Sequence, residues 1–165
     1  MKTRYGGFFL ARRHEVANMY VIQGILIRTS IAVVVPAGLQ CIALGGGYTL
    51  IPLGTQAREQ FDIPYCPITD DGDAVLPESI VGLCVALSTN DCVAYLEAES
   101  FGGPVLQASA LFDHGSMVAP VLVDSHAINA ALRYLGVVAP PDLDEFDTVG
   151  LGRQRDTDQW LPGAT

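Results

Sequence analysis

The chain has 165 residues, of which half are hydrophobic and 16% are charged, with a formal net charge of −9. This length predicts a single folded domain, and this hydrophobicity excludes an intrinsically disordered chain. No apolar run reaches the ~20 residues of a membrane span, and the excess of acidic residues argues against nucleic-acid and membrane partners.

The first 18 residues differ in charge from the rest of the chain. They contain four basic residues and one acid, but they lack the long apolar stretch and the cleavage pattern of a secretion signal. We therefore expect residues 1–18 to be an N-terminal extension. Without them, residues 19–165 carry 5 bases and 17 acids, a net charge of −12. Such a charge favours a basic partner, although the alternative is that it only maintains solubility.

The four cysteines favour a reducing compartment. They form no CxxC pair, and no histidine lies near them at zinc-ligand spacing. Three of them lie inside apolar runs, where a free cysteine is an ordinary core residue. We therefore expect a cytoplasmic protein with reduced cysteines, with two disulfide bonds as the alternative.

In the first half of the chain, β-branched runs separated by proline and glycine predict four strands. These cover residues 19–28, 30–35, 39–44 and 48–54. A short helical turn is expected over residues 55–61. The proline- and aspartate-rich segment 62–77 predicts the main loop.

The second half of the chain predicts two helices and further strands. Apolar spacing of three and four residues predicts helices over residues 78–88 and 125–135. Alternating side chains predict strands over residues 91–100 and 105–112, and a strand broken by proline over 117–123.

Together these elements predict an α+β fold. We expect an antiparallel, strongly twisted sheet of about six strands, with the two helices packed on one face. The domain is expected to span residues 19–139. The acidic C-terminal tail, residues 140–165, is expected to pack on the domain and to cover a sheet edge.

The stretch EAESFGGPVLQAS (97–109) predicts a hairpin with two nearby carboxylates. A three-residue Gly-Gly-Pro turn pairs Glu99 with Gln107 and Glu97 with Ser109, whereas a two-residue turn pairs polar with apolar residues. Because register follows the hydrophobic pattern, we predict the three-residue turn.

Three interpretations of this hairpin remain open. Its polar face is the ordinary solvated side of a sheet, a recognition surface, or a reaction site. In the last case Glu97 and Glu99, same-face neighbours on a strand, would act as an acid/base pair in a small hydrolase or transferase.

Other catalytic signatures are missing from the sequence. It contains no G-x-S-x-G elbow, no phosphate-binding glycine loop and no calcium-loop ligand order. The sequence therefore assigns no metal and no cofactor, and no catalytic residue beyond the weak candidates Glu97 and Glu99.

The tail combines acidic residues with aromatic ones. Asp144, Glu145 and Asp147 surround Phe146, and Trp160 follows further along the tail. This cluster either grips a basic partner, because aromatic residues dominate interface energetics, or folds back over the core.

Three segments, SFGGPVLQAS, INAALRYLGV and DEFDTVGLGRQRDTDQW, resemble a pattern of small bacterial proteins of unassigned activity. The resemblance covers about residues 91–160. It implies a bacterial setting and carries no catalytic assignment.

We interpret the chain as a non-catalytic acidic binding protein, an immunity-type inhibitor that captures a basic protein partner such as a toxin. The expected contact residues are Glu97, Glu99, Phe101, Gln107, Asp144, Glu145, Phe146, Asp147 and Trp160. The alternatives are the carboxylate-pair enzyme and a subunit of a homo-oligomer such as a homodimer.

Overall fold

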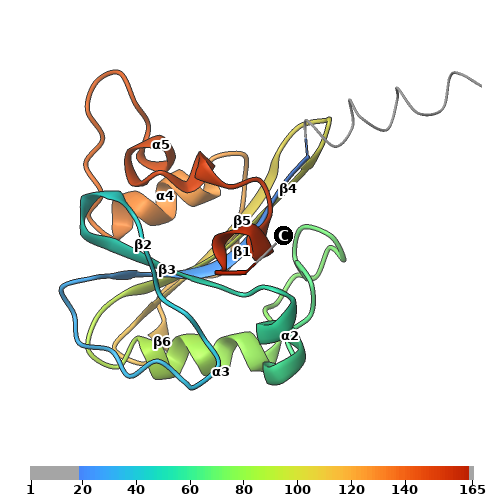
Figure 1. The fold of residues 1–165 in the computed structure, drawn as a ribbon, viewed down its shortest axis with the longest axis vertical. Helices are drawn as coiled ribbons and strands as arrows, with labels where there is room; N and C mark the ends of the chain where they lie inside the picture. The colour runs from blue at the N-terminus through green and yellow to red at the C-terminus, as the bar shows by residue number, and fades with distance from the viewer. Residues whose placement is uncertain (1–18, 164–165) are drawn as a thin grey trace, which may run out of the picture.

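The computed structural model describes residues 19–163, so the expected N-terminal extension lies outside the described residues. A twisted sheet crosses the middle of the molecule, with helices above and below it (Figure 1). Its strands, in chain order, are β1 Met19–Arg28, β2 Ile42–Ala43, β3 Tyr48–Pro52, β4 Val93–Phe101, β5 Leu106–Asp113, β6 Ser116–Met117 and β7 Leu122–Val123.

The sheet is antiparallel throughout the described residues. Its strand order is β2-β3-β1-β4-β5-β6, and β7 also pairs with β5. This confirms the predicted α+β class and the antiparallel sheet. The structure has seven strands because the broken strand expected over 117–123 forms two separate two-residue pairings.

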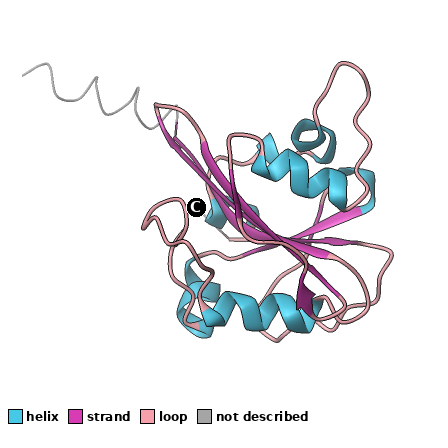
Figure 2. Ribbon diagram, turned by 180° about the vertical axis from the view of Figure 1, so that it is seen from behind, coloured by secondary structure: helices cyan, strands magenta, loops and turns pink. Residues whose placement is uncertain are grey.

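The helices lie on opposite faces of the sheet, as Figures 1 and 2 show. α3 packs on one face, and α4 and α5 lie on the other. The placement of both main helices on one face was wrong. The helices are α2 Thr55–Phe61, α3 Glu78–Leu87, α4 Ala127–Tyr134 and α5 Glu145–Val149, with 3-10 turns η1 Gly45–Gly47, η2 Leu151–Arg153 and η3 Thr157–Trp160.

Two separate cores explain this arrangement. On β4, Leu96 packs with Ile128 and Leu132 of α4, whereas Tyr95 packs with Ile80 of α3 on the other side of the sheet. Successive side chains of a strand point to opposite faces, and both sets on β4 are buried. A sheet that is apolar on both faces needs a cover on each.

One predicted strand does not form. Residues 30–35 run as a loop, and Val34 is 93% exposed. Val33 and Val35 still pack against the α3-side core. β-branched residues favour strands only where a neighbouring strand accepts their backbone hydrogen bonds, and none pairs with this segment within residues 19–163.

The tail packs on the domain and completes the edge of β1. β3 pairs with β1 only from Gly24 onward. Before Gly24, the Val21 N–H donates to the Arg155 carbonyl at 2.9 Å, and the Gln23 N–H donates to the Thr157 hydroxyl at 3.0 Å. The tail therefore covers backbone groups that the sheet leaves unpaired.

At Gly24, β3 passes too close to β1 to leave room for a side chain. A Cβ at Gly24 would lie 2.8 Å from Leu50 Cδ1 and 3.1 Å from the Ile51 carbonyl oxygen. We expect Gly24→Ala to lower the free energy of unfolding by about 1–3 kcal/mol, measured by urea denaturation. Gly82→Ala, at an exposed position of α3, is the control. Its Cβ meets nothing within 4 Å, so it should raise stability by up to about 1 kcal/mol. Equal effects of the two changes would contradict the packing argument.

Candidate functional site

The β4–β5 hairpin has the register that the sequence argument rejected. Glu99 lies opposite Leu106, and Glu97 lies opposite Ala108. The predicted pairing of the glutamates with Gln107 and Ser109 was therefore wrong by one residue. Because strand side chains alternate, the two glutamates point to the α3 side of the sheet, and Gln107 points to the α4 side.

Glu97 is fully buried, at 0% exposure, and both its carboxylate oxygens accept hydrogen bonds from the protein. Its Oε1 accepts the backbone N–H groups of Ile68 at 2.7 Å and Thr69 at 3.1 Å. Its Oε2 accepts the Tyr95 hydroxyl at 3.1 Å. Of the three interpretations left open by the sequence, the solvated strand face is therefore wrong for Glu97. The carboxylate instead fastens the loop after α2 to the sheet.

Gln23 on β1 extends the same network. Its Nε2 donates to the Tyr95 hydroxyl at 3.1 Å and to the Pro64 carbonyl at 2.9 Å, and its Oε1 accepts the Cys66 N–H at 3.3 Å. Cys66 has a φ of 33°, in the left-handed region that costs a non-glycine residue about 1–3 kcal/mol. The surrounding hydrogen bonds hold the loop in this conformation.

Glu99 is also buried, at 5% exposure, at the outer end of this network. Its Oε2 accepts the Thr69 hydroxyl at 3.1 Å, and its Oε1 has no hydrogen-bond partner among the described residues. Burial raises the pKa of Glu97 from 4.5 to about 7 against the opposing effect of its hydrogen bonds. Burial also raises the pKa of Glu99, and the nearby Asp70 and Asp71 add to this effect.

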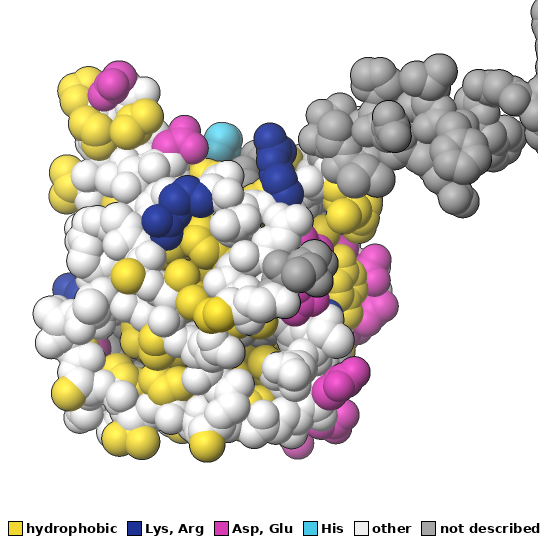
Figure 3. Space-filling model, in the orientation of Figure 1, with side chains coloured by type: hydrophobic (Ala, Val, Ile, Leu, Met, Phe, Trp, Pro, Cys, Tyr) yellow, Lys and Arg dark blue, Asp and Glu magenta, His cyan; other side chains and the backbone are white. Residues whose placement is uncertain are grey.

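The loop that these glutamates hold carries exposed carboxylates. We name as the acidic surface six exposed residues of α2, the loop after it and the start of α3. They are Glu59, Asp62, Asp70, Asp71, Asp73 and Glu78. None of them forms an ion pair within residues 19–163. Figure 3 shows acidic side chains gathered along this side of the molecule.

Arg58 is the only base in the segment that carries the acidic surface. Its guanidinium donates to the Leu53 carbonyl at 2.9 Å and lies 5.2 Å from the centre of the Tyr65 ring. It therefore stabilises the start of the loop and leaves the carboxylates unneutralised.

The acidic residues of the tail are largely engaged within the protein. Asp144 caps α5, accepting the Asp147 N–H at 2.8 Å and the Asn129 amide at 3.0 Å. Glu145 lies 3.6 Å from Arg133. Only Asp142 and Asp147 are exposed without a side-chain bond to another described residue.

The tail aromatics face inward. The Phe146 ring packs edge-on against Tyr20 at 5.8 Å, and Trp160 is 7% exposed with the Arg153 guanidinium 5.2 Å from its ring. This matches the alternative in which they fold back over the core. Phe101, at 61% exposure on the hairpin, is the one expected aromatic contact that stands free on the surface.

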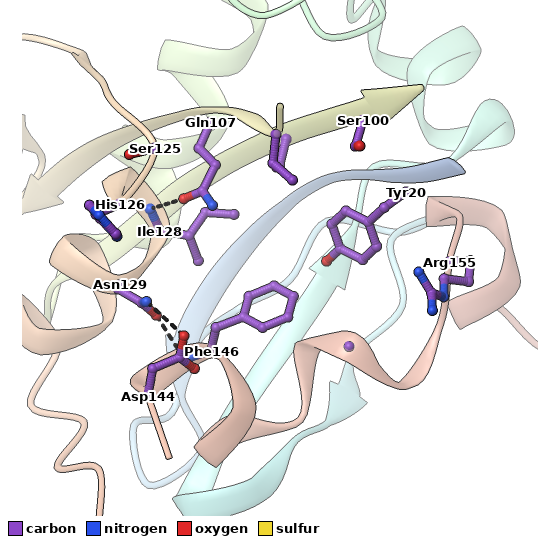
Figure 4. A pocket seen from close by; sticks show the side chains of 13 residues that line it. Tyr20, Ser100, Gln107, Ser125, His126, Ile128, Asn129, Asp144, Phe146 and Arg155 are labelled. Atoms are coloured by element: carbon purple, nitrogen blue, oxygen red, sulfur yellow. Dashed lines mark hydrogen bonds between the residues drawn. The ribbon is translucent and has the colours of Figure 1, made fainter. Parts of the chain in front are cut away.

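A cavity of about 500 Å³ lies on the other face of the sheet, between β1, β4, β5, α4, α5 and the tail (Figure 4). The structure brings Gln107, Asp144 and Phe146 together there, all three from the predicted contact set. It adds Tyr20 and Arg155, which sequence reasoning missed because their proximity arises only when the tail folds back onto β1.

Comparisons with protein-family models, with curated proteins and with solved structures find no match to this chain. The resemblance to small bacterial proteins therefore stays a prediction. Among the described residues, no helix is both long and apolar enough to cross a membrane. The same residues contain no cluster of three or more side chains suited to a metal ion.

Proposed function

We propose that the protein is a non-catalytic binding protein that captures a basic protein partner, in the manner of toxin-immunity proteins. The observation that carries the proposal is the acidic surface. Six exposed carboxylates lie within 20 residues of the chain, and no ion pair among the described residues neutralises them. The charge of −12 over residues 19–165 adds to their field.

The anchoring of the loop supports this role. Glu97 and Glu99 hold Ile68 and Thr69, so that Asp70 and its neighbours start from a fixed backbone. Binding by a pre-ordered loop avoids the entropy cost of ordering it in the complex. A concentrated negative field also accelerates encounter with a positive partner. The two buried glutamates thus serve the surface without touching the partner.

The environment of Glu97 favours binding over catalysis. Both carboxylate oxygens are taken by protein donors, and the side chain has no exposed area. A general acid or base must come within hydrogen-bond distance of its substrate, and the buried Glu97 side chain cannot contact one in this structure.

Capture from a lysate of the encoding organism tests the proposal. We expect immobilised full-length protein to retain a basic protein at about 50 mM salt and to release it at about 500 mM, over which the Debye length falls about threefold. The variant Asp70→Asn, Asp71→Asn, Asp73→Asn should bind the purified partner at least about tenfold more weakly, because it loses half of the charges of the acidic surface. It should still fold, because these side chains make no hydrogen bonds or ion pairs within the described residues.

The matched control removes three charges elsewhere. The variant Asp113→Asn, Asp142→Asn, Asp147→Asn has the same net charge but an intact acidic surface. It should bind within about threefold of the wild type, because the three residues lie outside the acidic surface and Asp113→Asn keeps an amide group facing the His114 ring. Equal weakening by both variants, or a partner whose retention ignores salt, would refute the acidic surface as the contact.

The homo-oligomer alternative has one observation in its favour. Phe101, Leu106 and Val123 are exposed apolar residues on the hairpin and on β7. Sedimentation equilibrium of the full chain decides between the two, since capture of a foreign partner predicts a monomer in its absence.

A further inference from the structure

The cavity between the sheet and the tail has apolar walls around a polar set. Tyr20 and Ala98 line it from β1 and β4, and Ile128 and Phe146 line it from α4 and α5. Figure 4 shows Tyr20, Ile128 and Phe146 around it. Its volume of about 500 Å³ falls within the roughly 300–1,000 Å³ of small-molecule sites. The two aromatic rings suit an aromatic or branched apolar body, since edge contacts with rings are favourable.

Two side chains of the cavity, Gln107 and Arg155, offer donors that are free within the described residues. The Gln107 Oε1 accepts the Ile128 N–H at 3.0 Å, which leaves its Nε2 without a partner among the described residues. The guanidinium of Arg155 forms no hydrogen bond or ion pair within residues 19–163. These two donors lie toward opposite ends of the cavity, with the rings between them (Figure 4).

The carboxylate and amide oxygens of the cavity already accept hydrogen bonds from the protein. Both carboxylate oxygens of Asp144 accept protein N–H groups. The Asn129 side-chain oxygen accepts the Phe146 N–H, and its nitrogen donates to Asp144. Asp144 is the only acid lining the cavity. With one arginine and one aspartate the lining is formally neutral, unlike the acidic molecule as a whole, and its one free charged group is the Arg155 guanidinium.

We infer that this cavity binds a small amphipathic carboxylate, a molecule with one anionic group on an aromatic or branched apolar body. The anion pairs with Arg155 at the tail end, and the body lies against the contacting rings of Tyr20 and Phe146. Charge-assisted hydrogen bonds to a guanidinium are about twice as strong as neutral ones. The inference is independent of the acidic surface, which lies on the other side of the sheet.

Three ligands with one naphthalene body test the charge preference. They are 1-naphthylacetate, 1-naphthaleneacetamide and 2-(1-naphthyl)ethylamine, titrated into the full chain by calorimetry. We expect the carboxylate to bind at least about tenfold tighter than the amide, with the amine weakest. The overall charge of the protein favours the reverse order, so general electrostatics cannot produce this result.

A matched pair of arginine variants locates the binding. Arg155→Gln, at an exposed position, should weaken the carboxylate at least about tenfold and leave the amide unchanged. Arg133→Gln removes the same charge outside the cavity and should leave both unchanged. No binding by any of the three ligands, a carboxylate no tighter than the amide, or equal effects of the two variants would each overturn the inference.

Discussion

Glu97→Gln is expected to remove a pH dependence of about 3 kcal/mol from the stability of this protein. Burial raises the pKa of Glu97 to about 7, against 4.5 for an exposed glutamate. Each pH unit between these values is worth about 1.4 kcal/mol. The folded state therefore binds this proton more tightly than the unfolded state does, and its stabilising contribution is complete below pH 4.5 and lost as pH rises to about 7.

The glutamine keeps most of the hydrogen bonds. Its amide oxygen can accept the Ile68 and Thr69 N–H groups, while its NH₂ replaces an acceptor at Tyr95 and costs about 1 kcal/mol. We expect the variant to be less stable than the wild type at pH 4.5 and more stable at pH 8.

Urea denaturation of both proteins from pH 4.5 to pH 8 measures the difference between their free energies of unfolding. The other carboxyl groups titrate alike in the two proteins, so their contributions cancel in this difference. Glu78→Gln, at an exposed residue of the acidic surface, is the control and should show no such crossing. A stability difference between Glu97→Gln and the wild type that does not change with pH would show that Glu97 titrates normally.

Trp160→Ala is expected to lower the free energy of unfolding by about 3–5 kcal/mol, which would be a large share of the stability of a domain this size. Trp160 is 7% exposed and packs in the core on the α4 side. Its removal leaves a cavity and takes the ring from beneath Arg153. Far-ultraviolet circular dichroism in urea measures the loss. Tryptophan fluorescence cannot be used, because Trp160 is the only tryptophan and the variant lacks it.

Trp160→Phe serves as the matched control, since it keeps an aromatic ring in place and should cost less than half as much. The Trp160→Ala variant should bind the basic partner as the wild type does under conditions where this variant remains folded. Unchanged stability together with lost partner binding would return Trp160 to the role of an interface residue and would contradict its burial.

The regular elements follow from local sequence patterns. The β-branched run of β1, the alternation of β4 and the three- and four-residue spacing of α3 and α4 predicted these elements. The prolines and aspartates of segment 62–77 predicted the main loop. In each case the controlling interactions lie within a few residues of one another, so a short window of sequence contains them.

The site was only partly predictable. The sequence singled out Glu97 and Glu99 but did not predict their burial, because their alternation with Ala98 resembles that of a half-exposed strand. The main loop covers that face, and its backbone N–H groups satisfy Glu97. Which loop lies over which strand depends on contacts 28 to 30 residues apart in the chain, and alternation carries no information about them.

The sequence by itself determined the fold class, the main helices and strands, and the excess of negative charge. Only the tertiary structure decided which face each helix covers, the register of the β4–β5 hairpin and the burial of the carboxylate pair. The physical reason is that propensity and periodicity act between neighbours along the chain, whereas these three features depend on which distant segments meet. A one-residue slip exchanges the two faces of a strand, and where both faces are buried the hydrophobic pattern no longer selects the register.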